Sequence, residues 1–359
     1  MRADAHHHPR NPPPGTEPSE GSHDGRAQVR DEDRPMTARG LGRTKVRISP
    51  LGFGAAPIGN LYTPLDDDQA LATLEAAWDA GVRYYDTAPH YGLGLSEQRL
   101  GAALAHRPRA EFTVSTKVGR LLEPHPAPTG SDLVAGGFAV PDTLIRRPDY
   151  SRDGVLRSLE GSLTRLGLDR VDIVYVHDPD DHLDVALDQA LPALASLRDQ
   201  GVIGAIGVGM NAVAPLLRIV AAADVDALMV AGRWTLIDRT AGPLLQVCAE
   251  RGVSVVAAAP FNSGLLSRPE PPDGAFYDYG RAPESVLRRA RSLAEVCARH
   301  GTVLPHAAVR FPLRHPVVAG VVAGFRSPAE VSSAAHWIAE DLTDAVWSDL
   351  DAGDPDSGE

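Results

Sequence analysis

The sequence predicts a single α/β domain that folds as a (β/α)8 TIM barrel, and two observations support this fold class. The first is composition: 43% of the 359 residues are hydrophobic and only 5% are aromatic, so the core is built mainly from aliphatic side chains. The second is rhythm, because eight strand-length apolar runs alternate with helix-length amphipathic segments. Eight strand–helix units fit a closed barrel. The alternative is an open, doubly wound sheet, which normally has fewer units and a phosphate-binding loop near its start.

The first 38 residues differ from the rest of the chain. They contain three histidines at 6–8, three prolines at 12–14 and a charged run at 31–34, with almost no large apolar residue. Such a segment buries too little surface to offset the entropy of ordering it. We therefore expect a disordered tail over 1–38 and a barrel domain over 39–359, with Met36 as an alternative candidate start of translation.

The barrel domain begins with a predicted β-hairpin over 39–48, and the eight units follow. The expected strands are 51–56, 83–87, 112–117, 172–176, 203–208, 227–231, 254–258 and 317–323. The expected helices are 67–80, 96–105, 152–166, 184–200, 212–223, 240–251, 284–300 and 327–339. Five helical patterns are followed by a glycine typical of helix C-caps: Gly81, Gly167, Gly201, Gly252 and Gly301. The last helix starts with the capping box Ser327-Pro328-Ala329-Glu330.

Two connections, over 118–150 and 260–283, are longer than turns require. Both follow strands, so in a barrel both cover its carboxyl end. Loops at that end usually carry function.

Four titratable residues follow the ends of three consecutive expected strands. Asp86, Lys117 and His177 close the second, third and fourth strands, and Tyr91 lies in the loop after the second. Each has an ordinary structural explanation when taken alone. As a set, they are expected to converge at the carboxyl end of the barrel, because the ends of parallel strands meet there.

The segments around these residues resemble the signatures of aldo-keto reductases. They are 85–101 (YDTAPHYGLGLSEQRLG), 114–118 (VSTKV) and 163–177, and the resemblance extends from about residue 39 to about residue 350. It implies an NAD(P)-dependent enzyme that moves a hydride between nicotinamide and a carbonyl or hemiacetal carbon. The implied catalytic residues are Asp86, Tyr91, Lys117 and His177.

Each implied role has a chemical reason. Tyr91 exchanges a proton with the reacting oxygen, which requires its pKa to fall from about 10 toward neutrality. Lys117 supplies a cation that favours the phenolate, and Asp86 holds Lys117 in place. His177 donates a hydrogen bond to the reacting oxygen.

The same resemblance implies a cofactor site at the ends of the later strands. Its candidate residues are Gly209, Asn211, Pro260, Asn262, Gly264, Leu265, Gly324, Phe325, Arg326, Ser327 and Glu330. The chain departs from the family pattern here, because Gly209 replaces a serine, Asn211 lies one place late, and no glutamine or stacking tyrosine follows on the next two strands. Glu330 falls where the family has an arginine for the 2′-phosphate, which favours NAD slightly over NADP. Arg326 at the start of the last helix favours a phosphate.

Two further runs, HDPD at 177–180 and PFNSG at 260–264, resemble a subgroup of aldose 1-dehydrogenases. Candidate substrate-binding residues in the strand-end loops are His90, Arg120, Arg233 and Trp234. These polar groups and the flat indole suit a sugar, so we expect oxidation of an aldose at C1 to its lactone. Pyridoxal, which forms a cyclic hemiacetal, and simple aldehydes or ketones are the alternative substrates.

Other classes of protein fit less well. The net charge of −12 and the lack of a basic stripe argue against nucleic-acid binding. No stretch could span a bilayer and no secretory signal is recognisable, so we expect a cytoplasmic protein with no membrane partner. Cys248 and Cys297 are expected to be ordinary buried thiols.

Two other functions are alternatives to this one. A metal-dependent barrel hydrolase is disfavoured because no His-x-His ends the first strand, and no metal is expected. A cofactor-binding barrel that regulates a partner without turnover is the alternative from a different class. The sequence does not indicate an oligomeric state.

Overall fold

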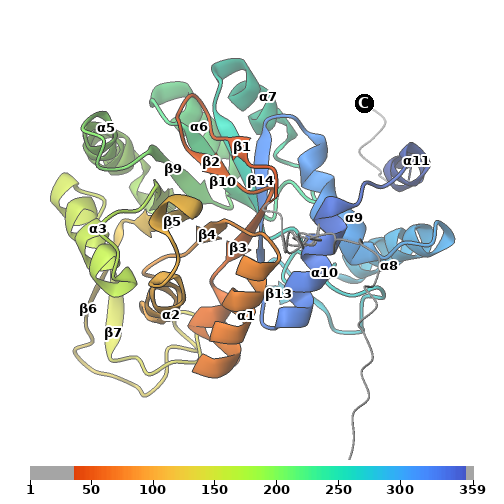
Figure 1. Cartoon of the computed structure of the whole chain (residues 1–359), viewed down its shortest axis with the longest axis horizontal. Coiled ribbons are helices and arrows are strands. Elements are labelled where there is room, and N and C mark those ends of the chain that lie inside the picture. The colour runs from red at the N-terminus through yellow and green to blue at the C-terminus, as the bar shows by residue number, and fades with distance from the viewer. Residues whose placement is uncertain (1–35, 353–359) are drawn as a thin grey trace, which may run out of the picture.

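The computed structural model describes residues 36–352, and within them eight parallel strands close into a barrel surrounded by helices (Figure 1). In chain order the barrel strands are β3 (Leu51–Gly54), β4 (Tyr84–Asp86), β5 (Thr113–Val118), β8 (Ile173–His177), β9 (Ala205–Met210), β10 (Ala227–Ala231), β11 (Ser254–Ala258) and β14 (Val318–Gly324). Each pairs with the next in parallel, and β14 returns to β3. The predicted fold class is confirmed, and each predicted strand overlaps an observed one.

The helices follow the predicted order. They are α1 (Asp67–Asp79), α2 (Leu95–Leu104), α3 (Arg152–Leu166), α5 (Leu191–Asp199), α6 (Val213–Ala222), α7 (Gly242–Arg251), α8 (Glu284–Arg299) and α10 (Pro328–Ala339). The helix predicted over 184–200 is interrupted, because α4 (Leu183–Val185) and a π-helical turn over Ala186–Ala190 precede α5. Pro192 at the start of α5 has no N–H for the carbonyl four residues earlier, and a wider turn accommodates that loss.

The seventh unit differs from the prediction. The segment expected to be loop after residue 300 contains a further helix, α9 (Leu304–Arg310), which leads into β14 and packs on α10. Helix α8 packs with α9 and with α11 (Asp344–Ala352) around a second hydrophobic cluster that includes Leu293 and Leu350. Figure 1 shows α8 and α11 together at the right, beyond the ring of helices. The pattern missed α9 because seven residues are too few for helical periodicity to stand out.

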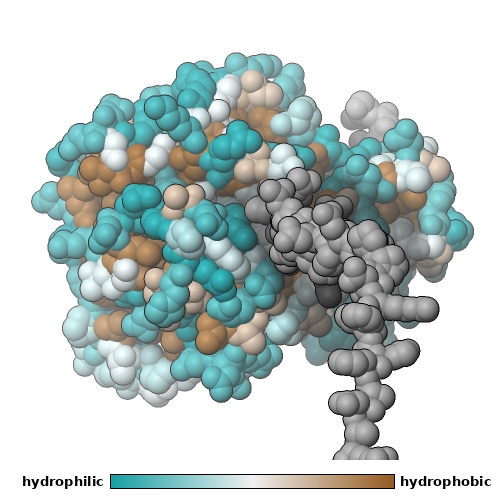
Figure 2. Space-filling view, viewed as in Figure 1, coloured by the Kyte–Doolittle hydropathy of each residue, from teal (hydrophilic) through white to brown (hydrophobic). Residues whose placement is uncertain are grey.

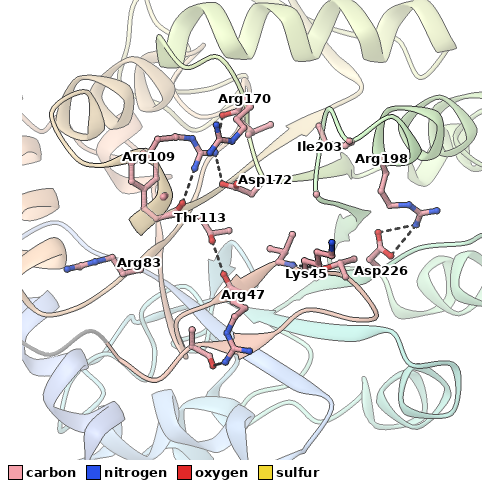
Figure 3. Close-up of a pocket in the computed structure, with 18 of the residues that line it drawn as sticks. Lys45, Arg47, Arg83, Arg109, Thr113, Arg170, Asp172, Arg198, Ile203 and Asp226 are labelled. Carbon is pink, nitrogen blue, oxygen red and sulfur yellow. Dashed lines mark hydrogen bonds and ion pairs between the residues drawn. The ribbon is translucent and has the colours of Figure 1, made fainter.

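The predicted N-terminal hairpin closes the amino end of the barrel. It is formed by β1 (Arg39–Gly40) and β2 (Arg47–Ile48), and Ile48 is fully buried against side chains of the barrel interior. Thr113 Oγ1 donates a 2.8 Å hydrogen bond to the Arg47 carbonyl and so fastens the hairpin to β5 (Figure 3). A cavity of about 1150 Å³ lies beside this hairpin, at the end of the barrel away from the predicted site.

The boundary of the predicted tail lies slightly earlier than expected. Met36 is partly buried against the main core, and its backbone N–H donates to the Gly81 carbonyl at 3.4 Å. Residues 36–38, which were assigned to the tail, therefore have a defined place. The remainder of the predicted tail, 1–35, lies outside the described residues.

Both long connections form two-stranded hairpins that the sequence pattern did not predict. In the first, β6 (Arg120–Pro124) pairs with β7 (Leu144–Pro148). In the second, β12 (Phe276–Tyr277) pairs with β13 (Gly280–Arg281). Both connections follow barrel strands, so they project from the carboxyl end of the barrel, where the predicted site lies.

The surface and the core have the expected character. Hydrophilic side chains predominate on the face in Figure 2, with apolar ones scattered among them. Cys248 and Cys297 are both buried and free. No helix within residues 36–352 is long and apolar enough to cross a membrane. In the same residues, no group of three or more His, Cys, Asp or Glu side chains is arranged to hold a metal ion.

Candidate active site

Three of the four predicted catalytic side chains lie at the same end of three neighbouring strands. Asp86 is the last residue of β4, Lys117 the penultimate residue of β5 and His177 the last residue of β8. Strand β5 pairs with β4 on one side and β8 on the other, so the three side chains emerge next to one another. All three residues are at most 6% exposed, which makes their charges strongly dependent on local partners.

Tyr91 reaches this cluster from the loop after β4. Its backbone is pressed against the short 3-10 helix over Pro57–Gly59, and two glycines permit the approach. A β-carbon on Gly59 would lie 2.9 Å from the Tyr91 carbonyl carbon, and one on Gly92 would lie 2.2 Å from the Gly59 oxygen. Gly92 also has φ of +63°, which favours glycine. The segment before α1 therefore fixes the place of Tyr91.

Lys117 holds the cluster together. Its Nζ donates to Asp86 Oδ2 at 2.6 Å, to the Thr87 carbonyl at 3.1 Å and to Tyr91 Oη at 3.0 Å. An ammonium group has three N–H donors, and all three are used. Burial disfavours the charged form, but Asp86 and Tyr91 outweigh it, and the pKa of Lys117 is raised. Lys117 is therefore a fixed cation beside the phenol.

Two buried polar side chains inside the barrel orient Asp86. Ser115 Oγ donates to Asp86 Oδ1 at 2.7 Å and lies 3.0 Å from the Tyr84 hydroxyl. Ser115 and Tyr84 are completely buried inside the barrel. Both carboxylate oxygens of Asp86 therefore have hydrogen-bond donors in a buried place.

The expected lowering of the Tyr91 pKa is wrong for the protein by itself. Burial raises the pKa of Tyr91 to about 12, and the Lys117 charge offsets only part of that effect. The sequence indicated the cation but could not show that the phenol is partly withdrawn from water. Tyr91 is thus a protonated acid at neutral pH, ready to give a proton to a developing alkoxide.

His177 is neutral, with its donor facing the cluster. Burial, and then the charge of Arg120, lower the pKa of His177 well below 6.5. Its Nε2 lies 3.5 Å from Asp178 Oδ2, whereas its buried Nδ1 has no partner among the described residues. We therefore assign the proton to Nε2, where a carboxylate faces it. The imidazole and Tyr91 rings meet edge to face at 5.9 Å, so both can approach one substrate oxygen.

Two of the four predicted substrate residues lie beside this cluster. The His90 ring is 5.6 Å from the His177 ring and 6.0 Å from the Tyr91 ring. Burial, and then nearby cations, lower the pKa of His90 to about 2, so it is also neutral. Arg120, the first residue of β6, lies 3.4 Å from His90 Nδ1. Both residues therefore lie close to His177.

The other two predicted substrate residues have different partners. Arg233 forms ion pairs with Asp238 at 3.3 Å and with Asp278 at 2.9 Å, so it anchors the turn of the β12–β13 hairpin. The indole of Trp234 packs 5.4 Å from the Phe311 ring and donates to the Pro312 carbonyl. The ring packs against the second hydrophobic cluster, so these internal contacts cover part of the indole. The prediction that Trp234 offers its face to a sugar is therefore not supported.

The strand ends beyond His177 suit a nicotinamide ring. A β-carbon on Gly209 would lie 3.7 Å from Lys117 Cε, so the bare backbone leaves room beside the catalytic cation. Asn262 is 5% exposed, and its Nδ2 donates to the Gly232 carbonyl at 3.1 Å. Its buried Oδ1 has no partner in the described structure. A carboxamide N–H would satisfy that acceptor, so the residues present fit the cofactor.

The other predicted residues of this region are held by burial, by turn geometry or by a side-chain contact. Leu265 is fully buried in the second hydrophobic cluster, and Pro260 is buried as well. Gly264 has φ of +90° in a turn where Asn262 and Ser263 also have positive φ. Asn211 Nδ2 donates to Tyr279 Oη at 3.0 Å and so ties β9 to the β12–β13 hairpin. That hairpin lies over the ends of β9 and β10.

The predicted adenosine end is already occupied by internal contacts. The Arg326 guanidinium donates to the carbonyls of Leu61, Thr63 and Pro64, so it holds the segment before α1. Glu330 Oε2 accepts from the Arg326 backbone N–H at 2.7 Å, and Ser327 Oγ accepts from the Glu330 N–H. The Glu330 side chain therefore bonds to the N–H of Arg326, the residue before the N-cap Ser327. In the predicted capping box it would bond to the N–H of Ser327 itself.

Gly324, the last residue of β14, and Phe325, which follows it, are the remaining predicted residues at this end of the site. The Phe325 side chain packs in the core, 5.7 Å from Phe53, so only its backbone faces outward. Gly324 lies close to Pro57, which a β-carbon would meet at 2.8 Å.

Sequence reasoning missed the support behind Lys117. Glu97 is fully buried on α2, accepts from Thr116 Oγ1 at 2.8 Å and pairs with Arg165 at 2.6 Å. This bridge joins α2 and α3 to the residue before Lys117 and fixes the end of β5. Both charged residues lie in the segments that resemble the family signature, which was the available signal.

Comparison with known proteins gives a consistent result. The model of the Aldo/keto reductase family matches residues 50–354. D-threo-aldose 1-dehydrogenase from a Pseudomonas species is 49% identical over 84% of this chain and 93% of that protein. Pyridoxal 4-dehydrogenase from Microbacterium luteolum is 36% identical over 87% and 96%, respectively. Among solved structures, an aldo-keto reductase from Bacillus halodurans in its holo form has a TM-score of 0.71 at 26% identity, covering 89% of this chain and 96% of that one.

Proposed function

The chain belongs to the aldo/keto reductase family and is an NAD(P)-dependent oxidoreductase, and we propose that it oxidises an aldose at C1 to the lactone. The observation that carries the catalytic part is the contact set of Lys117. Its Nζ joins the Asp86 carboxylate and the Tyr91 hydroxyl at 2.6 and 3.0 Å. That arrangement gives a phenol a permanent neighbouring cation in a buried place, as proton exchange by tyrosine requires.

The chemistry follows from the protonation states. The oxidised nicotinamide, when bound, accepts the hydride that leaves C1. Tyr91 takes the proton of the anomeric hydroxyl, and the neutral His177 donates from Nε2 to the same oxygen. Because burial holds the pKa of Tyr91 near 12, oxidation by this route quickens with rising pH, and reduction is favoured at lower pH. Lys117 stabilises the Tyr91 phenolate that must be present to accept this proton.

A sugar substrate is supported by the relatives and by the polar surroundings of the reacting position. The relative at 49% identity is a D-threo-aldose 1-dehydrogenase, and L-galactose dehydrogenase from Arabidopsis thaliana is 30% identical. His90 and Arg120 lie close to His177 and can bind hydroxyl groups. Pyridoxal is a second candidate because a pyridoxal 4-dehydrogenase is 36% identical.

For the cofactor, we propose a slight preference for NAD. The Glu330 carboxylate lies at the start of α10, bonded to the Arg326 backbone. A carboxylate there repels a 2′-phosphate and can accept from a ribose hydroxyl. The Arg326 side chain, which would favour NADP, is bonded to carbonyls of residues 61–64.

The test is to offer L-fucose, L-galactose, D-arabinose and pyridoxal with NAD or NADP and to follow the absorbance of the reduced nicotinamide. We expect oxidation of at least one sugar. Oxidation of pyridoxal alone would favour the second candidate. No sugar oxidation together with rapid reduction of aromatic aldehydes would indicate a general carbonyl reductase. Cofactor binding without turnover of any carbonyl compound would indicate a regulatory barrel.

The role of Tyr91 is tested by Tyr91→Phe, which removes only the hydroxyl. We expect turnover to fall by about two to four orders of magnitude while cofactor binding persists. Tyr85→Phe is the matched control, because Tyr85 is also buried but its hydroxyl donates to the Val82 carbonyl, outside the cluster. Near-normal turnover of Tyr91→Phe, or an equal loss in the control, contradicts the assignment.

A further inference from the structure

Asp178, the residue after His177, is held in an uncommon backbone conformation. Its φ is +41°, which non-glycine residues rarely adopt. The Asp178 N–H donates to the Gly209 carbonyl at 3.0 Å, and Tyr150 Oη donates to the Asp178 carbonyl at 2.9 Å. These two contacts maintain the conformation from both sides. Strain that the surroundings hold in this way is concentrated at functional sites. The result here is that the Asp178 carboxylate points back toward His177, with Oδ2 3.5 Å from Nε2.

Arg120 fixes the direction of this carboxylate. Its Nη2 donates to Asp178 Oδ2 at 2.7 Å, while Nη1 lies 3.4 Å from His90 Nδ1. The side chains of Arg120 and Asp178 are 23% and 31% exposed, so the pair is partly screened from water. Asp178 Oδ1 has no hydrogen-bond donor among the described residues. An oriented carboxylate with a free acceptor therefore stands beside the catalytic histidine.

The distance from Asp178 Oδ2 to His177 Nε2 places this carboxylate next to the reacting oxygen. The substrate oxygen must lie within hydrogen-bond reach of both Tyr91 Oη and His177 Nε2. Asp178 Oδ2 is 3.5 Å from that same Nε2, so it neighbours the oxygen on C1. In an aldose the nearest further donor is the hydroxyl on C2, because vicinal sugar oxygens lie within hydrogen-bond distance of each other. An ionised carboxylate can only accept, so it suits a hydroxyl at this place.

We propose that Asp178 binds the substrate by accepting a hydrogen bond from the C2 hydroxyl of the aldose, and that Arg120 is the positioning residue for this contact. This inference rests on the proposed function. The contact makes the site selective for substrates that carry a hydroxyl next to the reacting carbon. A substrate that lacks a donor next to the reacting carbon leaves the carboxylate without its partner, which lowers its transition-state binding. Simple aldehydes are disfavoured for that reason.

The test compares D-arabinose with 2-deoxy-D-ribose, which is the same sugar without the C2 hydroxyl. The measured quantity is the ratio of the two kcat/KM values, with the preferred cofactor at saturation. Hydrogen bonds to charged groups predict a ratio of roughly 10 to 150 in favour of D-arabinose for the unaltered protein. The intrinsic reactivities of the two sugars differ, but that difference cancels when the ratio is compared between variants.

The variant is Asp178→Gly, because glycine adopts positive φ without strain and removes the carboxylate. We expect the ratio to fall at least about tenfold, mainly through loss of activity on D-arabinose. Asp178→Asn, which keeps the size of the side chain and also tolerates positive φ, serves if the glycine variant does not fold; it should lower the ratio as well. Asp181→Asn is the control, because Asp181 is an exposed carboxylate of the same segment, and its ratio should be unchanged.

Arg120→Gln should lower the ratio less than Asp178→Gly does, since the carboxylate is still present but less well oriented. The inference is overturned if Asp178→Gly reduces kcat/KM for both sugars by one common factor and leaves the ratio unchanged. Asp178 would then only position His177. If the unaltered protein oxidises neither these sugars nor those of the first panel, the proposed function fails and this inference fails with it. Sugar oxidation with an unchanged ratio refutes this inference alone.

Discussion

Replacing Lys117 with methionine should cost more stability than the same substitution at the exposed Lys45, because it leaves a buried charge without its partner. Lys117 Nζ and Asp86 Oδ2 are 2.6 Å apart, and their side chains are only 2% and 3% exposed. Removing one partner of a buried ion pair typically costs about 3–5 kcal/mol. Asp86 keeps the hydrogen bond from Ser115, which places the expected loss near the lower end of that range.

The second part of this prediction is that a further substitution at Asp86 restores part of the lost stability. Asp86→Asn removes the negative charge with little change of shape, so the double variant contains neither buried charge. We expect the double variant to be less destabilised than the sum of the two single variants, with a coupling free energy of about 1–3 kcal/mol.

The assay is urea unfolding of the four proteins, with the free energy of unfolding taken from the transition. Activity supplies an independent readout: Lys117→Met should lose turnover because Tyr91 loses the cation that favours its phenolate. The double variant should regain stability but not activity. If the two single effects add to within about 0.5 kcal/mol, the pair does not interact as its geometry indicates, and the account of the cluster is refuted.

Three other perturbations test separate parts of the structure. Deleting residues 1–35 should leave melting temperature and turnover unchanged, because the foldable pattern begins at about residue 36; a large loss of either would show that the tail binds to the barrel. The free energy of unfolding should fall as pH drops below about 6.5, by up to about 1.4 kcal/mol per pH unit for each neutral buried histidine. His90 has a folded pKa of about 2, so only the unfolded chain takes up its proton in this range and stability rises with pH. His90→Gln should flatten this dependence between pH 6.5 and 5, as measured by urea unfolding, and an unaltered slope would argue against a neutral His90. Glu330→Ala should raise kcat/KM with NADP relative to NAD, whereas Glu340→Ala, an exposed change at the other end of α10, should not; equal ratios in both would leave Glu330 only its capping role.

The part of the site formed by β4, β5 and β8 was predictable, because the ends of these strands determine where its side chains lie. Asp86, Lys117 and His177 are strand-terminal residues, and the alternation of apolar runs with helical segments specifies which strands are neighbours. Once the barrel is recognised, their convergence follows from parallel pairing. The subgroup motif at 177–180 also pointed toward Asp178, although it did not indicate what that carboxylate contacts.

Loop residues were less predictable, because their side-chain directions depend on contacts between distant segments. Trp234 lies in a strand-end loop as expected, yet its indole is drawn toward Phe311 and Pro312, far away in sequence. Arg326 lies at a helix start as expected, yet the carbonyls of residues 61–64 take its guanidinium. Periodicity carries no information about either choice.

The sequence by itself therefore determined the barrel, the order of its strands and the identity of the three residues at their ends, with Tyr91 in the loop after the second. Only the tertiary structure decided the electrostatics of the site. Tyr91 is a partly buried acid with a pKa near 12, and Arg120 is brought to Asp178 by a hairpin that no local sequence pattern predicted. The physical reason is that strand and helix periodicity is a property of neighbouring residues, whereas burial and charge pairing depend on which segments meet when the chain is folded.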